Sequence, residues 1–158
     1  PDLRMAEALM AWKAGDYGIA LDLWAPLAQA GVAGAQSNMG AAFLEGRGVE
    51  RDPDKAVSWL RLAAQQGDAG GQRNLALCYY EGWGVPQDQE QAASWYLRAA
   101  EQGDVEAQDM LSWMKLVGGG CAQDYLDARV WAEKAASKGS VGAMARLGDI
   151  HHNALGVE

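Results

Sequence analysis

The chain has 158 residues, 49% of them hydrophobic, and a formal net charge of −8. This length is enough to bury a substantial core, and the hydrophobic content excludes a disordered tail. The acidity opposes binding to nucleic acid or to anionic membrane surfaces, because both depend on basic residues that neutralise phosphates. No apolar stretch approaches the roughly 20 residues that cross a bilayer, so we expect no membrane insertion.

Residues 1–31 predict an N-terminal helical hairpin with a tight Ala-Gly-Asp-Tyr turn at residues 14–17. Asp16, Ala20 and Ala28 keep the register of the later units, but the long glycine loop of those units is absent. A different end unit is expected, because a terminal repeat has only one neighbour to cover it. The chain starts at Pro1 without a charged-then-apolar leader, so both a cytoplasmic location and export with a removed signal peptide stay open.

From Gly31 onwards the sequence repeats itself every 36 residues. The positions in register include four glycines, three tryptophans and three aspartates: Gly31, Gly67, Gly103 and Gly139; Trp59, Trp95 and Trp131; Asp52, Asp88 and Asp124. A period between 20 and 50 residues is typical of solenoids. We therefore predict one all-α domain over residues 1–158, a right-handed α–α superhelix of antiparallel helix pairs. Its units are residues 1–31, 32–67, 68–103 and 104–139, with a partial unit at 140–158.

The second helix of each unit is the clearer one. Ala56, Leu60 and Ala63 belong to an apolar stripe with helical spacing, which the next two units repeat. Asp52 is the expected N-cap with Pro53 at the first helical position, and Asp88 and Asp124 repeat the cap. The glycine that ends each of these helices suits the left-handed position after a helix C-terminus.

The first helix of each later unit follows at once, with Asp68, Asp104 or Ser140 as its expected N-cap. A small residue in the middle of this helix, such as Gly40, predicts close approach of the paired helix, with the repeated tryptophan filling the space beside it. A Gly-x-Gly-Val loop joins the two helices. The third unit departs from this pattern, because Lys115 replaces an aromatic residue and Cys121 replaces the valine, so we expect altered loop geometry there.

Residues 75–103, LALCYYEGWGVPQDQEQAASWYLRAAEQG, resemble the Sel-one-like repeat, a relative of the tetratricopeptide repeat. The residues that carry the resemblance are the small residue after Leu75, the Gly82-x-Gly84-Val85 loop, and the later Asp, Ala, Trp, Ala-Ala and Gly positions. The first unit resembles the shorter-looped tetratricopeptide form. The resemblance implies a bacterial protein-interaction module, and the settings known for the family include assembly scaffolds, signalling regulators, host-interaction factors and immunity proteins that neutralise secreted toxins.

Most catalytic and metal-binding patterns are missing from the sequence. There is no Gly-x-Ser-x-Gly, His-Glu-x-x-His or phosphate-loop pattern. A β-lactam hydrolase, proposed for some relatives, is a weaker alternative, because Ser37, Ser58 and Ser94 lack the Lys three residues on that a Ser-x-x-Lys site needs, and only Ser112 has it, at Lys115. His151 and His152 are adjacent on a helix and point about 100° apart, which suits one inward and one solvated side chain better than chelation. Cys78 and Cys121 lack metal-site spacing, and we expect two packed thiols, with a single bridge as the alternative. We expect no cofactor, no metal and no enzyme.

The remaining candidate function is binding on a concave face lined by the first helices. Carrying the tetratricopeptide groove positions across by register selects residues that, unlike the core, do not repeat: Ser37, Ala41, Leu44, Glu45, Arg73, Leu77, Tyr80, Glu81, Asp109, Trp113, Leu116, Asp149, His152 and Asn153. Tyr80 and Trp113 are the expected anchors, since aromatic residues are enriched at binding hot spots.

These positions predict a scaffold that binds a peptide or protein, and its acidity favours a partner of basic character. An immunity protein against a toxin is one alternative. A carbohydrate-binding module that stacks sugars on Trp83 and Trp113 is another. The sequence ends at Glu158, before the second helix of the last unit, so we also expect this end to be able to pair with a second copy.

Overall fold

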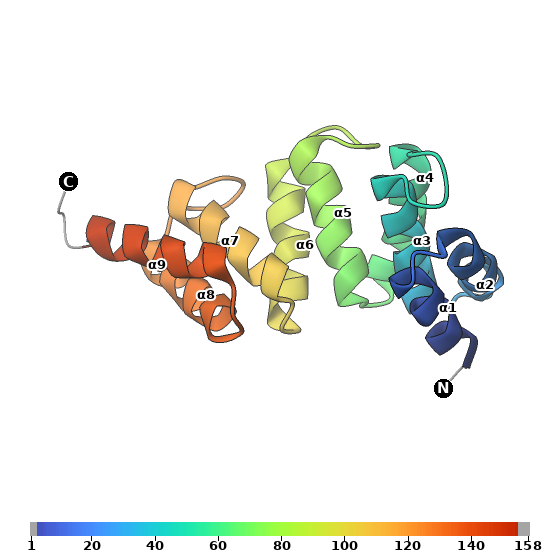
Figure 1. Ribbon diagram of the computed structural model, residues 1–158. Coiled ribbons are helices and arrows are strands. Elements are labelled where there is room, and N and C mark those ends of the chain that lie inside the picture. The colour runs from blue at the N-terminus through green and yellow to red at the C-terminus, as the bar shows by residue number, and fades with distance from the viewer. Residues whose placement is uncertain (1–2, 155–158) are drawn as a thin grey trace. The chain divides into compact units, whose positions relative to one another are not determined.

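A computed structural model describes residues 3–154, and every regular element in that range is an α-helix (Figure 1). The helices are α1 (Leu3–Lys13), α2 (Tyr17–Gln29), α3 (Ala33–Glu45), α4 (Pro53–Gln65), α5 (Ala69–Glu81), α6 (Gln89–Glu101), α7 (Val105–Val117), α8 (Tyr125–Ser137) and α9 (Val141–Ala154). We call α3, α5, α7 and α9 the A helices and α4, α6 and α8 the B helices. The predicted all-α class and the 36-residue alternation of helices are confirmed.

The helix ends form where the sequence places them. The predicted N-cap side chains each accept a hydrogen bond from the backbone N–H three residues on, at 2.8–3.2 Å, and they are Asp52, Asp68, Asp88, Asp104, Asp124 and Ser140. Each such bond satisfies one of the amide groups that a helix leaves unpaired in its first turn. The glycines after the B helices, Gly67, Gly103 and Gly139, have φ of 92°, 95° and 93°, as the sequence predicts.

The chain forms two compact units, Pro1–Gln87 (unit 1) and Asp88–Glu158 (unit 2). In unit 1, α3 packs against α2, α4 and α5; in unit 2, α7 packs against α6, α8 and α9. The organisation as a single domain remains a prediction. The expected last glycine loop at Gly156 lies outside the described residues.

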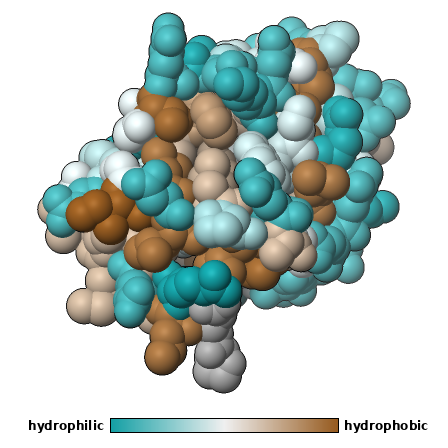
Figure 2. Space-filling model, turned by 90° about the vertical axis from the view of Figure 1, so that its right-hand side faces the viewer, coloured by the Kyte–Doolittle hydropathy of each residue, from teal (hydrophilic) through white to brown (hydrophobic). Residues whose placement is uncertain are grey.

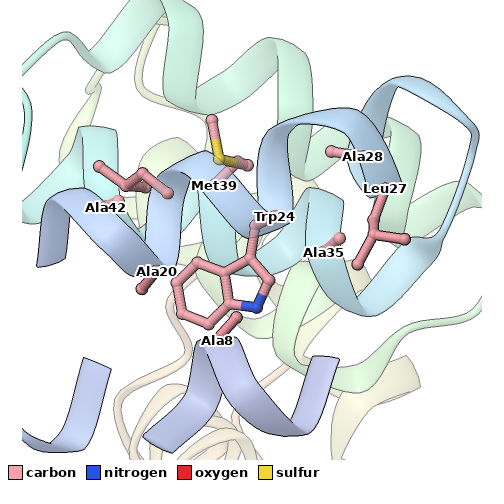
Figure 3. Close-up of a cluster of buried hydrophobic side chains, with 9 residues drawn as sticks. Ala8, Ala20, Trp24, Leu27, Ala28, Ala35, Met39 and Ala42 are labelled. Atoms are coloured by element: carbon pink, nitrogen blue, oxygen red, sulfur yellow. The ribbon is translucent and has the colours of Figure 1, made fainter. Parts of the chain in front are cut away.

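The core of unit 1 is built around one tryptophan. Trp24 of α2 is 2% exposed and lies among small side chains of the neighbouring helices, among them Ala8 of α1 and Ala35 of α3 (Figure 3). The other members of this cluster are Ala20, Leu21, Leu27, Ala28, Met39 and Ala42. Alanines on three helices leave room for one large ring, so the helices approach closely while Trp24 fills the space between them.

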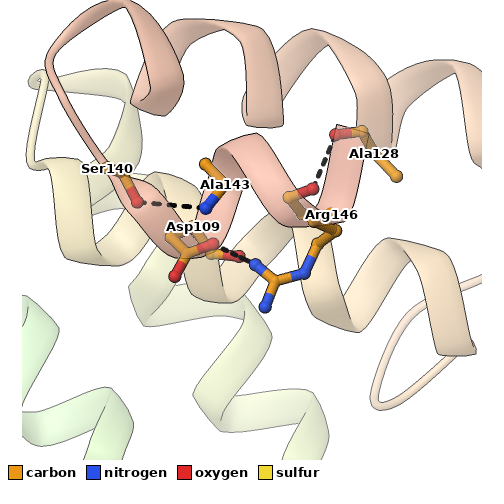
Figure 4. A network of polar contacts seen from close by, with 6 residues as sticks. Asp109, Ala128, Ser140, Ala143 and Arg146 are labelled. Atoms are coloured by element: carbon orange, nitrogen blue, oxygen red, sulfur yellow. Dashed lines mark hydrogen bonds and ion pairs between the residues drawn. The ribbon is translucent and has the colours of Figure 1, made fainter. Parts of the chain in front are cut away.

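The close approach predicted at Gly40 is confirmed, but the residue that fills the space is different. A Cβ added to Gly40 would lie 2.6 Å from Leu60 Cδ2 and 3.3 Å from the Ala56 carbonyl oxygen of α4. Leu60 is fully buried, whereas Trp59 beside it is only partly buried and packs at the edge of the cluster. At Gly40 the expected role of the tryptophan was therefore wrong: Leu60, the residue after Trp59, enters the helix interface. In unit 2 the equivalent of Gly40 is Ser112, whose Oγ donates to the Ala128 carbonyl at 2.7 Å (Figure 4).

A repeated buried glutamine ties successive helices together. Gln36, Gln72 and Gln108 donate from Nε2 to the carbonyl oxygen eight residues earlier, near the C-terminus of the preceding helix, at 3.1, 3.3 and 3.1 Å. Carbonyl groups in the last turn of a helix have no partner within the helix. In unit 1, Gln66 also donates to Gln36 Oε1 at 2.7 Å. The carbonyls of Ala28, Ala64 and Ala100 also accept from the backbone N–H of the glycine three residues on, at 3.0 Å. Each glutamine therefore adds a second hydrogen bond to its carbonyl and satisfies its own buried amide nitrogen.

The loop of the third unit keeps the geometry of the others, so the expected alteration is wrong. Gly118 and Gly120 both have φ of 73°, against 69° and 75° for Gly46 and Gly48. A Cβ on Gly120 would collide with the Gln89 carbonyl, and glycine is therefore required by the backbone itself. The change from valine to Cys121 alters one side chain of this loop and leaves its path unchanged.

Both ends of the described chain expose apolar side chains. Figure 2 views unit 1 from the side of α1 and α2, where hydrophobic residues lie among polar ones; Leu3, Leu9, Met10 and Ile19 are the large exposed ones on these helices. On α9, Val141 is 79% and Met144 51% exposed, and an added Cβ on Gly148 would meet nothing within 4 Å. Gly148 is the register equivalent of Gly40, so its side of α9 lacks the cover that Leu60 gives α3. Self-association through this end remains a prediction.

Candidate functional site

Helix α3, the first A helix of unit 1, borders a pocket of about 260 Å³. Ala41 and Glu45, two of the predicted groove positions, line it together with residues of α1, α2 and the loop after α3: Leu9, Trp12, Trp24, Asn38 and Arg47. Three helices thus contribute to one hollow, lined by four aromatic or aliphatic residues and by the polar Asn38, Glu45 and Arg47. Polar groups that converge beside apolar side chains are usual in a ligand-binding site.

Aromatic and charged contacts hold the walls of this pocket. The ring of Trp12 lies 4.5 Å from that of Tyr17 and 5.3 Å from that of Trp24, measured between centroids. Arg47 pairs with Glu45 at 3.1 Å, and its guanidinium lies 5.8 Å above the Tyr17 ring. Both members of this ion pair are about half exposed, so a charged partner can exchange with either of them at small cost.

Trp24 adds an unpaired donor to the same region. Its indole Nε1–H is buried and has no hydrogen-bond acceptor among the described residues. Buried indole N–H groups usually find an acceptor, and leaving one unpaired costs about 1–3 kcal/mol.

The other predicted positions of unit 1 differ in accessibility. Ser37 and Leu44 are buried, so they face the helix interface rather than a surface. Arg73, Leu77 and Tyr80 are half-buried, and Glu81 is exposed. The Tyr80 backbone carbonyl accepts a hydrogen bond from Gln87 Nε2 at 2.8 Å, which fixes the end of α5.

In unit 2 the structure brings Asp109 and Trp113 together with Arg146, which the sequence analysis did not select. Arg146 of α9 forms an ion pair with the Asp109 carboxylate and donates to the Asp109 carbonyl at 3.0 Å (Figure 4). Its guanidinium also lies 5.4 Å from the centre of the Trp113 ring. Trp113 is 38% exposed, and the contact with Arg146 holds its indole at the surface.

The remaining predicted positions of unit 2 differ in accessibility. Asp149 and His152 are exposed, Leu116 is buried, and the side chain of Asn153 lies outside the described residues. His151 is also exposed, so the expectation that one of the two histidines points inward was wrong.

Between residues 3 and 154, no three His, Cys, Asp or Glu side chains are placed to hold a metal ion. Both cysteines are free thiols: Cys78 is buried and Cys121 half-buried. Burial raises the pKa of the Cys78 thiol to about 11, and burial also raises the pKa of Cys121. A raised pKa lowers the thiolate fraction and opposes a nucleophilic role. None of the described helices has both the length and the apolar character that a bilayer-spanning helix needs.

Several site residues were missed at the sequence level. Trp12 and Trp24 belong to the first hairpin, which has no aligned groove positions, so register alone could not select them. Arg146 is in register with Asn38 and Asn74, and the change from a neutral to a charged residue is the only sequence signal that distinguishes it. The glutamines at 36, 72 and 108 do repeat with the 36-residue period, and that repetition was a usable signal.

The chain matches known repeats along most of its length. The Sel1 repeat family matches residues 33–68, 69–104, 105–140 and 141–158. The chain belongs to the Sel1 repeat family. Its repeats begin one residue after the unit boundaries predicted from the sequence. Repeats of this family commonly serve as protein–protein interaction modules.

Solved structures of other Sel1-like proteins resemble this one. A Sel1 repeat protein from Oxalobacter formigenes is 32% identical with a TM-score of 0.85, over 98% of this chain and 63% of that protein. The protein c5321, a protective antigen of uropathogenic Escherichia coli strains, is 30% identical with a TM-score of 0.82, over 98% of this chain and 37% of that protein. Helicobacter pylori cysteine rich protein B is 28% identical with a TM-score of 0.56, over 59% of this chain and 70% of that protein.

The Sel1 chain described here thus spans less than two thirds of the length of the first two relatives. Among curated protein sequences, none matches it.

Proposed function

We propose that this Sel1 repeat chain is a non-enzymatic protein-interaction module that binds a peptide or protein on its A-helix surface. The observation that carries the proposal is the 260 Å³ pocket beside α3, where Ala41 and Glu45 meet Trp12 and Trp24. Both A-helix positions vary between repeats. Ala41 is replaced by Leu77 and Trp113, and Glu45 is kept as Glu81 but replaced by Val117. Positions that the helix packing does not fix are available for recognition of a partner.

The charge of the surface favours a basic partner. Glu45, Glu81 and Asp149 are exposed A-helix carboxylates, and the chain as a whole carries a net charge of −8. Complementary charge raises the rate of encounter and suppresses partners of like charge. Apolar contact with Trp12 in unit 1 and with Trp113 in unit 2 would then supply affinity, as aromatic residues at interface centres commonly do.

Site-directed photo-crosslinking tests this proposal. A benzophenone amino acid replaces Ala41 in the pocket, and a matched variant carries it at Ser58, an exposed position on α4. Exposed to a lysate of the source cells, the Ala41 variant should form one dominant protein adduct that mass spectrometry identifies. The Ser58 variant should form at least about tenfold less of that adduct, since α4 lies outside the proposed surface.

The partner identified in this way then provides a binding assay. Replacing Trp12 with Ala should weaken its binding by roughly ten- to thirtyfold, the usual cost of losing an aromatic hot spot. Equal crosslinking from Ala41 and Ser58, or a Trp12→Ala variant that folds and binds undiminished, would show that the A-helix surface of unit 1 is not the binding site.

A further inference from the structure

The groove between each B helix and the A helix that follows it differs between the repeats. In unit 1 an aromatic residue stands at the A-helix position that borders this groove. Phe43 of α3, which follows α2, packs against the core cluster, and the Lys55 ammonium of α4 lies 5.7 Å from its ring centre. One repeat later, Tyr79 takes the same register, and its hydroxyl accepts a hydrogen bond from Arg61 Nη2 at 3.2 Å.

In unit 2 the ring is missing and the groove is open. The residue in register with Phe43 and Tyr79 is Lys115, whose Nζ lies 3.2 Å from Asp127 Oδ2 of α8. The groove that remains between α6 and α7 has a volume of about 290 Å³. Its lining comprises Glu90, Ala93, Ser94, Leu97, Leu111, Lys115, Gly120 and Cys121.

The lining of this groove is suited to an apolar group. Leu97 stands where unit 1 has Arg61, so the hydrogen-bonded Arg–Tyr pair of unit 1 is replaced by an aliphatic wall. Leu97 is 39% exposed, a large apolar side chain without cover. Leu111 and Ala93 add further apolar surface beneath it.

The next copy of the groove differs again. Between α8 and α9 a space of about 270 Å³ is lined by Arg129, Glu133, Leu147, Ile150 and His151. There the register equivalent of Leu97 is Glu133, which pairs with Arg129 at 2.8 Å. An ion pair at this wall disfavours an apolar occupant, so the groove between α6 and α7 is the one shaped for a ring.

We propose that the groove between α6 and α7 receives an aromatic side chain of a protein partner, in the place that Phe43 and Tyr79 fill in unit 1. An apolar cavity of about 150 Å³ is sufficient to bind benzene, and this groove exceeds that volume. The inference rests on the proposed function only in taking its occupant from a protein partner, and it concerns a different surface.

Charge complementarity specifies the partner further. Glu90 is an exposed carboxylate of the lining, while the Lys115 ammonium is already paired with Asp127. With the net charge of −8, this favours an aromatic residue that carries a cationic neighbour. The matching ligand is therefore a Phe or Tyr next to Lys or Arg in a partner segment.

Tyramine, a phenol ring with a cationic amine, serves as the probe. In protein with labelled leucine methyl groups, tyramine should shift the NMR signals of Leu97 and Leu111 in a saturable manner. The Lys115→Tyr variant installs the ring of the preceding repeat, and it should lose these shifts while keeping its unfolding midpoint. Absence of shifts in the unaltered chain, or equal shifts in Lys115→Tyr, would overturn the proposal.

A reciprocal variant tests the same idea in unit 1. Replacing Arg61 with Leu and Tyr79 with Lys gives unit 1 the residues that unit 2 carries at positions 97 and 115, and tyramine should then also shift the methyl signals of Leu75, the equivalent of Leu111. Failure of this double variant to gain a site, with unit 1 folded by its methyl spectrum, would show that the two side chains do not determine ring binding.

Two further probes separate charge and self-association. Tyramine should bind roughly two- to fivefold tighter than 4-hydroxyphenylacetate, and Glu90→Gln should remove that difference, since exposed ion pairs contribute modestly. An unchanged preference in Glu90→Gln would contradict the assigned cationic neighbour. Shifts of Leu97 and Leu111 that depend on protein concentration without probe would show that a second copy fills the groove, which would overturn the assignment to another protein. None of these measurements uses the Ala41 pocket, so their failure leaves the proposed function standing.

Discussion

The two units repeat the same helix caps and loop glycines but differ in the side-chain contacts between their helices. Unit 1 carries Phe43 and Tyr79 at the position where unit 2 has Lys115, and it centres its core on Trp24. Unit 2 leaves both grooves open and connects its helices by polar contacts such as Ser112 to Ala128 and Arg146 to Asp109. Yet the loop glycines have the same positive φ in both units.

The comparison separates two kinds of position. Caps, loop glycines and buried glutamines are repeated because each of them satisfies a backbone requirement that recurs in every unit. The ring positions are not repeated, because the helices assemble with or without the ring. Variation between units therefore marks where binding can differ without loss of the fold.

The loop glycines provide the severest test of a shared backbone. Gly84 and Gly120 combine positive φ with no space, since an added Cβ would lie 2.5 Å from the Pro53 carbonyl oxygen or collide with that of Gln89. We expect Gly84→Ala and Gly120→Ala each to lower the free energy of unfolding by roughly 3 kcal/mol or more, from left-handed strain and steric overlap together. Urea unfolding followed by circular dichroism measures this loss.

The matched controls are Gly67→Ala and Gly139→Ala, where φ is positive but an added Cβ meets nothing within 4 Å. These should cost only about 1–2 kcal/mol. If Gly120→Ala proved as mild as Gly139→Ala while Gly84→Ala did not, the loop of unit 2 would differ from that of unit 1.

The buried glutamines should reveal a smaller difference between the units. Gln36 is paired at both ends of its amide, whereas Gln108 Oε1 has no partner among the described residues. Replacement with Met, the residue at the equivalent position 144, should therefore cost about 2–3 kcal/mol at Gln36 and about 1 kcal/mol less at Gln108. Thermal and urea unfolding of both variants check this order. Equal costs would mean that the Gln66 contact contributes nothing.

The cysteine thiols should give the smallest effect, which is a dependence of the free energy of unfolding on pH. Burial raises the Cys78 pKa from 9.0 to about 11, so above pH 9 the unfolded chain releases this proton before the folded one does. The resulting stabilisation is complete below about pH 8 and is lost as pH rises towards 11. Between pH 8 and 10 the loss should be about 1 kcal/mol. It should be absent in Cys78→Ala and largely retained in Cys121→Ala, as urea unfolding at both pH values would measure. A Cys121→Ala variant with the flatter dependence would contradict the assignment to Cys78.

Much of the fold could be predicted from the sequence, because the determinants of helix ends are local. Asp52 and its equivalents bond to a backbone N–H only three residues away, and the glycines act through their own φ. The role of Trp59 could not be predicted in the same way. Whether that residue or Leu60 enters the interface depends on a rotation of less than one third of a helical turn, which apolar spacing does not resolve.

The candidate sites were less predictable, because they depend on contacts between residues of different repeats. The register aligns equivalent positions of the repeats but does not show which non-equivalent residues touch. Register selected Asp109 and Trp113, which lie about one turn apart on α7, but the contact between Asp109 and Arg146 spans 37 residues. Register also selected Ser37 and Leu44, which the following helices cover. The open groove beside Lys115 follows from two differences between the repeats, Lys115 for Tyr79 and Leu97 for Arg61, and its shape depends on where the lysine side chain turns.

The buried glutamines have a consequence for how such a chain can change in length. Each 36-residue block carries at its start the amide that connects it to the block before, and at its end the carbonyl that the next amide requires. A tandem duplication of residues 33–68 would therefore bring a complete joint to both seams. Growth or shrinkage by whole blocks preserves every buried hydrogen bond of this kind, whereas an insertion between a glutamine and the carbonyl eight residues before it would change their spacing.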